Sequence, residues 1–525
     1  MDEIASPLSQ TANPIVDAAG GPSISSERGR LYLRNVSSSL IKMLIIAGTG
    51  LFLPAYLTHH LSTIEYGGWI LILQIASYIN YLDLGVQTAI AKYVAEYTSS
   101  GSSIERDRHA SAGVVITTCT AALGIVLSAV LGKMVPLLFP SMPHAIQREV
   151  ARGVFLMGTS TAFLLATSPF AALFLGLQRF GFSAFVESAN RILYTVVLVV
   201  AVMRHTSLTR MASEVAVLNV VTALVYLIAW RISLPHIHVR LSLISVAILK
   251  KVLGYCAVLG IWTASMLIIT GLDTALVGHF EFSATAYYAI AAAPVAFLIP
   301  MLGAVMSPLM PAFSALSVSS SAASFGELLT RTTRYITVLL ELSGLPLILF
   351  GYLILSLWTS STYAEHSLQL MRILLLANIV RNLWSPYATM VVATGSQRKA
   401  TLAAIAEASV NLASSIFLAF YFGALGVALG TLLGAIVGVS FHLSVSMKAT
   451  QKIVGISRRV FLRSGILRAL IASVPTLALL PLFLRARPVP YTPLWIAVWI
   501  VATAALTWRY ALDASERGSL VHKFV

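Results

Sequence analysis

Long apolar runs alternate with short polar connections along almost the whole chain. A helix needs about 20 apolar residues to cross the hydrocarbon core of a bilayer, and the runs reach that length. They are too long and continuous for barrel strands, whereas helices satisfy their own backbone hydrogen bonds in lipid. We predict fourteen membrane-spanning helices, at residues 36–58, 66–90, 111–137, 152–176, 183–203, 212–231, 253–278, 285–312, 335–358, 369–394, 401–422, 424–446, 466–484 and 491–511.

The composition agrees with this pattern. Hydrophobic residues make up 58% of the 525 residues and charged residues only 10%, against about 25% charged residues in a soluble domain. The predicted fold class is therefore an all-α polytopic membrane protein. The two cysteines, Cys119 and Cys256, fall in separate predicted spans, which argues against a structural disulfide or a metal site.

The basic residues predict the orientation of the chain. If the N-terminus is cytoplasmic, 25 of the 35 Lys and Arg residues lie in or beside cytoplasmic segments and 8 lie on the opposite side. This is the bias that cytoplasmic loops of membrane proteins show. It accounts for the net charge of +15 without a nucleic-acid partner, for which the sequence has no zinc-finger spacing or RNA-binding motif. We predict that both termini are cytoplasmic.

Two segments of the chain resemble each other. Ser168-Pro169 and Ser385-Pro386 are 217 positions apart, in the fourth and tenth spans. The turns that follow, GLQR at 176–179 and GSQR at 395–398, match at an offset of 219. Leu84-Gly85 and Leu302-Gly303 match at 218, and Glu187 and Asn190 match Glu407 and Asn411 at 220 and 221.

Six spans separate the two copies, so they point the same way through the membrane. Parallel repeats of this kind are a transporter architecture, with the site between two lobes. The predicted organisation is a disordered cytoplasmic tail at 1–30, six-helix lobes at 31–235 and 236–446, a basic linker with helices 13 and 14 at 447–512, and a cytoplasmic tail at 513–525.

Several stretches also resemble a known family. Residues 82–97, LDLGVQTAIAKYVAEY, and 272–290, LDTALVGHFEFSATAYYAI, look like the second and seventh spans of O-antigen flippases. The GLQRFGF and GSQRKAT turns and Leu357-Trp358 at the end of span nine follow in the same order. Over roughly residues 30–450 the chain resembles polysaccharide-biosynthesis flippases of the Wzx type, in the superfamily that also contains the lipid II flippase MurJ and the MATE drug exporters.

The resemblance implies both a substrate and a location. The substrate would be an oligosaccharide on a polyprenyl pyrophosphate carrier. It would move from the cytoplasmic to the periplasmic leaflet of a bacterial inner membrane, for O-antigen, capsule or exopolysaccharide assembly. A polysaccharide polymerase and a chain-length regulator are the implied protein partners.

Ionisable groups at bilayer depth usually face a cavity or a partner, so they are the candidate site residues. The basic candidates, which we expect to contact the pyrophosphate or headgroup, are Arg34, Lys42, Arg191 and Arg381. The acidic candidates, for the cavity or for a coupling ion, are Asp83, Glu187, Asp273 and Glu407.

Each candidate also has a structural interpretation. Glu187 and Arg191 are four residues apart on one helix face, so they either neutralise each other or face the substrate. Glu407 either accepts hydrogen bonds from another helix or titrates, and Asp273 faces a cavity or an interhelical partner. Arg381, the lead phosphate candidate, is alternatively a packing arginine.

Three further expectations concern the first, second and eighth spans. Asp83 and Lys92 are nine residues apart, which places them on roughly opposite faces of a continuous helix. Arg34 and Lys42 alternatively anchor span one to lipid headgroups. Pro294, Pro300 and Pro308, with Pro311, break helical hydrogen bonding along span eight and are candidates for gating.

Two other functions remain open. A cation-coupled drug exporter of the MATE class is the first alternative, although that class usually has about twelve spans. A membrane glycosyltransferase or polymerase is the second, but the first outer loop, 59–65, offers only His59, His60 and Glu65 as ionisable groups. We expect no catalytic residues, no metal and no cofactor.

Overall fold

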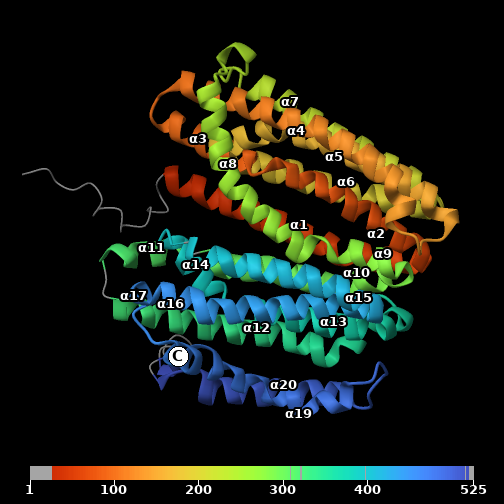
Figure 1. Cartoon of the computed structure of the whole chain (residues 1–525), viewed down its shortest axis with the longest axis vertical. Helices are drawn as coiled ribbons and strands as arrows, with labels where there is room; N and C mark the ends of the chain where they lie inside the picture. The colour runs from red at the N-terminus through yellow and green to blue at the C-terminus, as the bar shows by residue number, and fades with distance from the viewer. Residues whose placement is uncertain (1–26, 308, 320–321, 397, 515, 519–525) are drawn as a thin grey trace, which may run out of the picture.

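The computed structural model describes residues 27–307, 309–319, 322–396, 398–514 and 516–518. Every regular element in these ranges is a helix. The predicted tails lie mostly outside the described residues, which begin at Glu27 with the first helix. We call the end of the bundle that holds Glu27 and Arg517 the inner end, and the opposite end the outer end (Figure 1).

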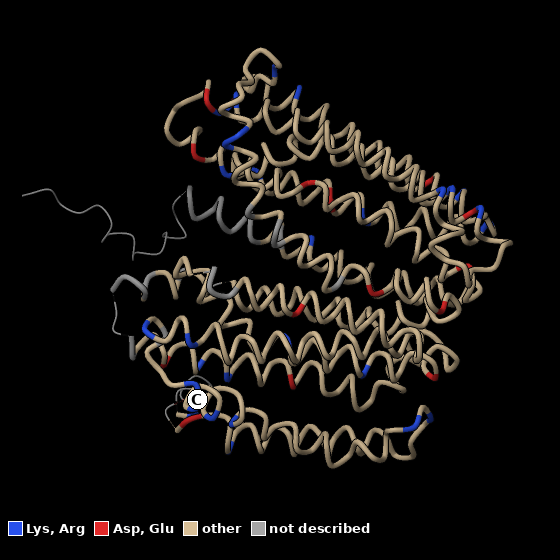
Figure 2. Tube along the Cα trace, in the orientation of Figure 1, with Lys and Arg blue, Asp and Glu red and all other residues tan. Residues whose placement is uncertain are grey.

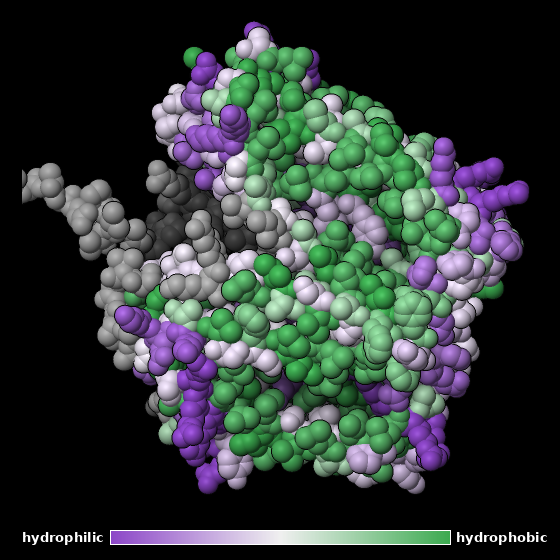
Figure 3. All heavy atoms as spheres, in the orientation of Figure 1, coloured by the Kyte–Doolittle hydropathy of each residue, from purple (hydrophilic) through white to green (hydrophobic). Residues whose placement is uncertain are grey.

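Lobe 1 consists of the first six spans. They are α1 (Glu27–His60), α2 (Thr63–Ser77) with η2 (Tyr78–Asp83) and α3 (Val86–Ser99), α4 (Ser103–Leu138), α5 (His144–Gly176), α6 (Phe180–Met203) and α7 (Leu208–Ser233). Most of these helices extend beyond the apolar runs that predicted them. Figure 2 shows charged residues gathered at the two ends of the bundle, and Figure 3 shows a broad apolar belt between them. This is the surface of a membrane-spanning bundle.

Lobe 2 contains spans seven to twelve. They are α8 (Val246–Met266) with η4 (Leu267–Gly271) and α9 (Asp273–Phe280), α10 (Thr285–Met306) with α11 (Leu309–Ser319), α12 (Ala322–Trp358), α13 (Ser361–Asn382) with α14 (Ser385–Ala393), and α15 (Arg398–Phe441), which holds two spans. The chain reverses inside α15 at Gly423, which has φ 53° and ψ −131°. Ser415 Oγ then donates to Val427 O at 3.3 Å across the hairpin.

The last two spans form a separate hairpin. Spans thirteen and fourteen run from α18 (Arg458–Phe461) through α19 (Val474–Phe483) and then along α20 (Thr492–Leu506). They pack on the face of lobe 2 that is turned away from lobe 1 (Figure 1). Twelve described segments are long and apolar enough to cross a membrane, one of them the double span Thr401–Ala449. With that hairpin counted twice and α13–α14 added, the fourteen predicted spans are confirmed.

The lobes meet at the outer end and part at the inner end. One apolar core at the outer end includes Tyr66 and Trp69 of α2 together with Tyr288 of α10 and Leu368 of α13. The inner end instead has two cores, one around α3 and one around α14. Figure 1 shows the two lobes splayed at this end. The lobes therefore share a core at the outer end and have separate cores at the inner end.

Span seven belongs to both lobes. Its inner half, α8, places Ile248, Val252 and Cys256 in the core of lobe 1. Its outer half, α9, packs on α15 of lobe 2, where Asp273 meets Thr431. The π-helical segment η4 joins the two halves. A π-helical turn disrupts the regular hydrogen-bond ladder, which makes it a natural place for a bend.

The second span is not the continuous helix that its apolar run predicts. It is interrupted by the 3₁₀ segment η2 and by Leu84 and Gly85, both left-handed, at φ 49° and 81°. A Cβ atom at Gly85 would lie 2.7 Å from Leu259 Cδ1, so only glycine fits. The prediction that Asp83 and Lys92 lie on opposite faces of one helix was therefore wrong.

The internal repeat is visible in the backbone at an offset of 217. Gln178 and Gly395 are both left-handed, at φ 59° and 65°. The next N–H closes the same wide turn in each lobe, from Arg179 to Phe174 O at 2.8 Å and from Ser396 to Val391 O at 2.9 Å. Each Ser-Pro pair begins ten residues before the left-handed residue. The match of the two GxQR strings at 219 was thus wrong by two positions.

The match of Leu84-Gly85 with Leu302-Gly303 also fails in the backbone. The first pair interrupts span two, whereas the second lies inside α10, which is continuous from Thr285 to Met306. The prediction that prolines break span eight is not met at Pro294 and Pro300. Both lie inside the continuous helix α10. Pro308 lies outside the described residues.

Candidate interlobe transport site

The basic and acidic candidates of lobe 1 form a cluster between α1 and α6. Lys42 Nζ lies 2.7 Å from Glu187 Oε2, with side chains 33% and 44% exposed. One turn further along α6, Arg191 Nε donates to Thr49 Oγ1 at 2.9 Å. The predicted alternative of a Glu187–Arg191 pair was wrong, because packing of α6 on α1 offers each side chain a closer partner. Arg34 lies in the second turn of α1, but its side chain is outside the described part of the structure.

The cluster involves α1, which runs along the side of lobe 1 next to lobe 2. Figure 1 shows α1 on that side. At the outer end Trp358 Nε1 of α12 donates to Leu51 O of α1 at 2.7 Å, which ties α1 to lobe 2. Lys42 lies nine residues before Leu51, on the inner half of α1 where the lobes part.

Lobe 2 brings together two residues that were predicted independently. Arg381 Nε of α13 donates to Glu407 Oε1 of α15 at 2.5 Å, and the side chains are only 16% and 11% exposed. Arg381 Nη1 also reaches Asn378 Oδ1 at 3.4 Å, while Nη2 is buried without a hydrogen-bond partner. Glu407 therefore accepts from another helix, the first of its two predicted roles. Arg381 is a paired cation with one unused donor.

Asp273 lies where η4 joins α9 and is 7% exposed. Its Oδ2 accepts from Tyr288 at 3.2 Å and from Thr431 at 3.0 Å, so its partners are hydroxyls on two other helices. Its Oδ1 is buried without a partner, as is Asn411 Oδ1. A carboxylate oxygen without a partner is costly to bury, which makes Asp273 a candidate for binding a cation or a proton.

Asp83 has a positioning role in the interrupted second span. Its Oδ2 accepts from the Gln87 N–H at 3.4 Å, at the start of α3. Its Oδ1 accepts from Ser168 Oγ at 3.4 Å, so the carboxylate also links α3 to the Ser-Pro segment of α5. These contacts explain why a carboxylate ends the 3₁₀ segment.

A polar junction between the lobes was not predicted. Gly271 O, at the end of the π-helical segment, accepts from Gln74 Nε2 at 2.7 Å and from Tyr78 OH at 2.8 Å. Gln74 and Tyr78 belong to lobe 1 and Gly271 to lobe 2. A glutamine inside an apolar span was the available signal in the sequence, but its partner is a backbone carbonyl 197 residues away.

Arginines that sequence reasoning did not select hold the last two spans in place. Arg372, 7% exposed, donates to Ile348 O at 2.9 Å, to Leu484 O at 2.8 Å and to Phe483 O. Its positive charge thus meets carbonyls at the C-terminal end of α19, a favourable place for a cation. This contact pins the outer end of span thirteen to lobe 2.

The inner end of the same hairpin is held by ion pairs. Arg334 lies 2.7 Å from Asp513 Oδ2 and 2.5 Å from Glu516 Oε1, and Arg468 also pairs with Asp513. Partial burial alone would raise the pKa of Asp513, but Arg468 and Arg334 outweigh it and hold that pKa below its usual value. The pKa of Glu516 is likewise lowered against the effect of burial, by the Asp513 N–H, Tyr335 and Arg334.

The fold is similar to that of solved membrane proteins. The structure described as lipid II flippase MurJ in an inward closed conformation superposes with a TM-score of 0.69 at 14% identity, covering 90% of this chain and 97% of that chain. A MATE family multidrug resistance transporter of the MOP superfamily, in an inward-facing conformation, gives 0.59 at 14% identity over 81% and 99%. A MOP superfamily transporter from Pyrococcus furiosus gives 0.53 at 15% identity over 81% and 96%.

These likenesses establish the fold class as a polytopic all-α bundle of the MurJ and MATE kind. Comparison of the sequence with protein-family models and with curated proteins gave no match.

Proposed function

We propose that this protein moves a lipid-linked, phosphate-bearing oligosaccharide across a bacterial inner membrane by alternating access. The substrate would be a polyprenyl-pyrophosphate oligosaccharide for O-antigen, capsule or exopolysaccharide assembly, taken from the cytoplasmic leaflet and released at the periplasmic one. A polymerase and a chain-length regulator would act on the released product. The protein itself would be a transporter and not an enzyme.

The observation that supports this proposal is the cluster of Lys42, Glu187 and Arg191 between α1 and α6 of lobe 1. The side chains of Lys42 and Glu187 are paired and are 33% and 44% exposed. A charged side chain buried without a partner at bilayer depth would be costly. Basic groups beside a carboxylate suit a headgroup that carries both a pyrophosphate and sugar hydroxyls. The sequence resemblance and the fold likeness to a lipid II flippase point to the same substrate class.

A second candidate function, cation-coupled export, is favoured by the Asp273 junction. The buried Oδ1 of Asp273, which has no hydrogen-bond partner, is a ligand of the kind a small cation prefers. The same junction would couple a flippase to an ion gradient, so the transported substrate decides between the two functions.

The test is transport by the purified protein in proteoliposomes. A fluorescent polyprenyl-pyrophosphate oligosaccharide should become accessible to a quencher in the opposite leaflet faster than in empty liposomes. A variant with Lys42→Gln and Arg191→Gln should lose this activity, while Arg108→Gln, at an exposed ion pair outside the cluster, should not. Movement of cationic drugs together with no movement of the lipid-linked sugar would reject the flippase in favour of the exporter.

A further inference from the structure

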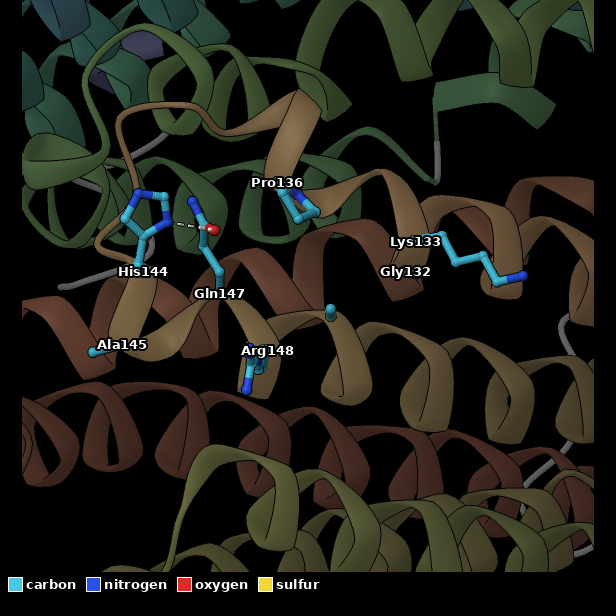
Figure 4. A pocket seen from close by; sticks show the side chains of 8 residues that line it. Gly132, Lys133, Pro136, His144, Ala145, Gln147 and Arg148 are labelled. Atoms are coloured by element: carbon cyan, nitrogen blue, oxygen red, sulfur yellow. Dashed lines mark hydrogen bonds between the residues drawn. The ribbon is translucent and has the colours of Figure 1, made fainter.

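A pocket of about 610 Å³ opens at the outer end of lobe 1, between the end of α4 and the start of α5. Figure 4 shows it with Lys133 on α4 and with His144, Gln147 and Arg148 on α5. It contains none of the residues of the interlobe cluster or of the Asp273 junction. Its own chemistry therefore needs a separate explanation.

The pocket concentrates unpaired positive charge. Lys133 and Arg148 are exposed, and neither forms an ion pair within the described ranges. The nearest carboxylate along α5, Glu149, is engaged elsewhere, because its Oε2 accepts from the Leu208 N–H at 2.8 Å. Only 8 of the 35 Lys and Arg residues are assigned to this side of the membrane. Two of them line one pocket, against the general depletion of basic residues there.

The start of α5 adds further donors. The helix begins at His144 after Pro143, and no side chain caps its first turn. His144 and Ala145 of that turn line the pocket. Free N–H groups and the partial positive charge at a helix N-terminus favour an anion. Together with Lys133 and Arg148, they make the pocket selective for negative charge.

The pocket is held in shape by a buried amide and a glycine. Gln147, 8% exposed, donates to Met142 O at 3.0 Å, and its Oε1 lies 3.1 Å from His144 Nδ1. The imidazole is thus oriented from inside the protein. A Cβ atom at Gly132 would lie 2.9 Å from Ala151 O, so glycine permits the close approach of α4 and α5 at the pocket floor.

The surroundings of the pocket indicate an amphiphilic ligand. Val130 and Val126 of α4, 45% and 58% exposed, precede Lys133 by one and two helical turns, on the membrane side of the pocket. A soluble anion would have no use for this surface, whereas acyl chains would pack on it. We propose that the pocket binds the phosphate group of an anionic phospholipid in the outer leaflet, in the orientation that the basic residues predict.

The test compares lipid retention by the full chain and two charge-matched variants. Lys133→Gln with Arg148→Gln removes both pocket charges, and Arg485→Gln with Arg487→Gln removes two charges at another outer loop. Native mass spectrometry would count phosphatidylglycerol and phosphatidylcholine bound to protein released from mixed nanodiscs. Each basic residue near a membrane surface is worth about a fivefold change in anionic-lipid binding at low salt.

We expect the pocket variant to lose phosphatidylglycerol about fivefold or more, and the Arg485 and Arg487 variant to keep it. Phosphatidylcholine binding should not change in either. Equal loss in both variants would overturn the proposal, because it would show a general effect of charge. Displacement of the lipid by millimolar inorganic phosphate, or phosphate binding without lipid binding, would overturn the lipid assignment and indicate a soluble anion.

Discussion

Arg381 and Glu407 form a nearly buried ion pair between α13 and α15, at 2.5 Å and 26 residues apart in the sequence. The two residues were predicted separately, one as a phosphate contact and the other as a coupling group. Because the two residues are paired, a substitution at either position affects the stability of the protein as well as any contact with a substrate. Removal of one partner leaves the other buried and uncompensated, at a cost of about 3–5 kcal/mol.

We therefore predict that Arg381→Ala lowers the thermal stability and the membrane abundance of the protein. The double variant Arg381→Ala with Glu407→Ala should recover most of the stability, since no lone charge remains. If Arg381 also contacts substrate through its unused Nη2 donor, transport stays low in the double variant. A double variant with normal transport would show that the arginine serves packing alone.

The Lys42–Glu187 pair is expected to behave differently because both side chains are partly exposed. Pairs of this kind contribute about 1 kcal/mol or less to stability. Lys42→Gln should leave the melting temperature within a few degrees of the parent and reduce transport at least tenfold. The double variant Lys42→Glu with Glu187→Lys keeps the ion pair but exchanges the positions of its two charges. Normal transport by Lys42→Gln would remove this cluster from the proposed site.

The two left-handed turns give a matched pair of stability predictions. Gln178→Gly should stabilise the protein by up to about 1 kcal/mol, since glycine adopts a positive φ without steric cost. Gly395→Ala should destabilise it by a similar amount, although nothing lies within 4 Å of the added Cβ. Thermal unfolding in detergent measures both changes. The same sign for both variants would contradict the equivalence of the two turns.

The sequence was sufficient for the parts of the fold that depend on the length of apolar runs. It located all fourteen spans, including α13–α14, whose Glu365, Arg372 and Arg381 lower its hydropathy. It could not locate the break at Gly85, because the reason for that glycine is Leu259 on another span. The interruption depends on the packing of span seven against span two, which the apolar run of span two alone does not reveal.

The candidate site was predicted only as a set of residues. Eight charged positions were selected by their depth, and the structure sorts those with described side chains into pairs that sequence spacing does not determine. Glu187 pairs with Lys42, 145 residues away in the sequence, and not with Arg191 on its own helix. Gln74 and Tyr78 escaped selection because their partner is a backbone carbonyl exposed by a π-helical turn. Partners of this kind depend on tertiary packing.

The ion pairs at the inner end of spans thirteen and fourteen predict a pH dependence. Asp513 and Glu516 have folded-state pKa values below the usual carboxyl range, which is about 4 in an unfolded chain. Their stabilising contribution is thus complete above about pH 5 and is lost as the pH falls through the lower folded values. Asp513→Asn should weaken docking at neutral pH and flatten this acid-side loss.

Limited proteolysis of the linker at 447–457 measures that docking. The parent should become more sensitive below about pH 4, and Asp513→Asn should be sensitive at all pH values. An unchanged cleavage rate in Asp513→Asn would show that the hairpin is held without Asp513, by Arg372 and the Glu516 ion pair.

The polar junction at Gly271 should influence the balance between conformations. Tyr78→Phe removes one of two hydrogen bonds to the Gly271 carbonyl and keeps the ring, at a cost of about 1 kcal/mol. We expect this variant to shift the population of the inner-open form by about fivefold and to change the transport rate. Tyr352→Phe, on α12 and outside this junction, is the control.

The central claim is that the lobes close at one end when they open at the other. Spin labels in a background without Cys119 and Cys256 would test it most directly, with Arg179 and Ser396 marking the inner end and Ile64 and Thr362 the outer end. Pulsed electron–electron resonance should give a long inner and a short outer distance without substrate. Addition of the lipid-linked oligosaccharide should populate a second form with the inner distance shortened and the outer distance lengthened. Distances that stay fixed, or that change in the same direction at both ends, would contradict alternating access by these two lobes.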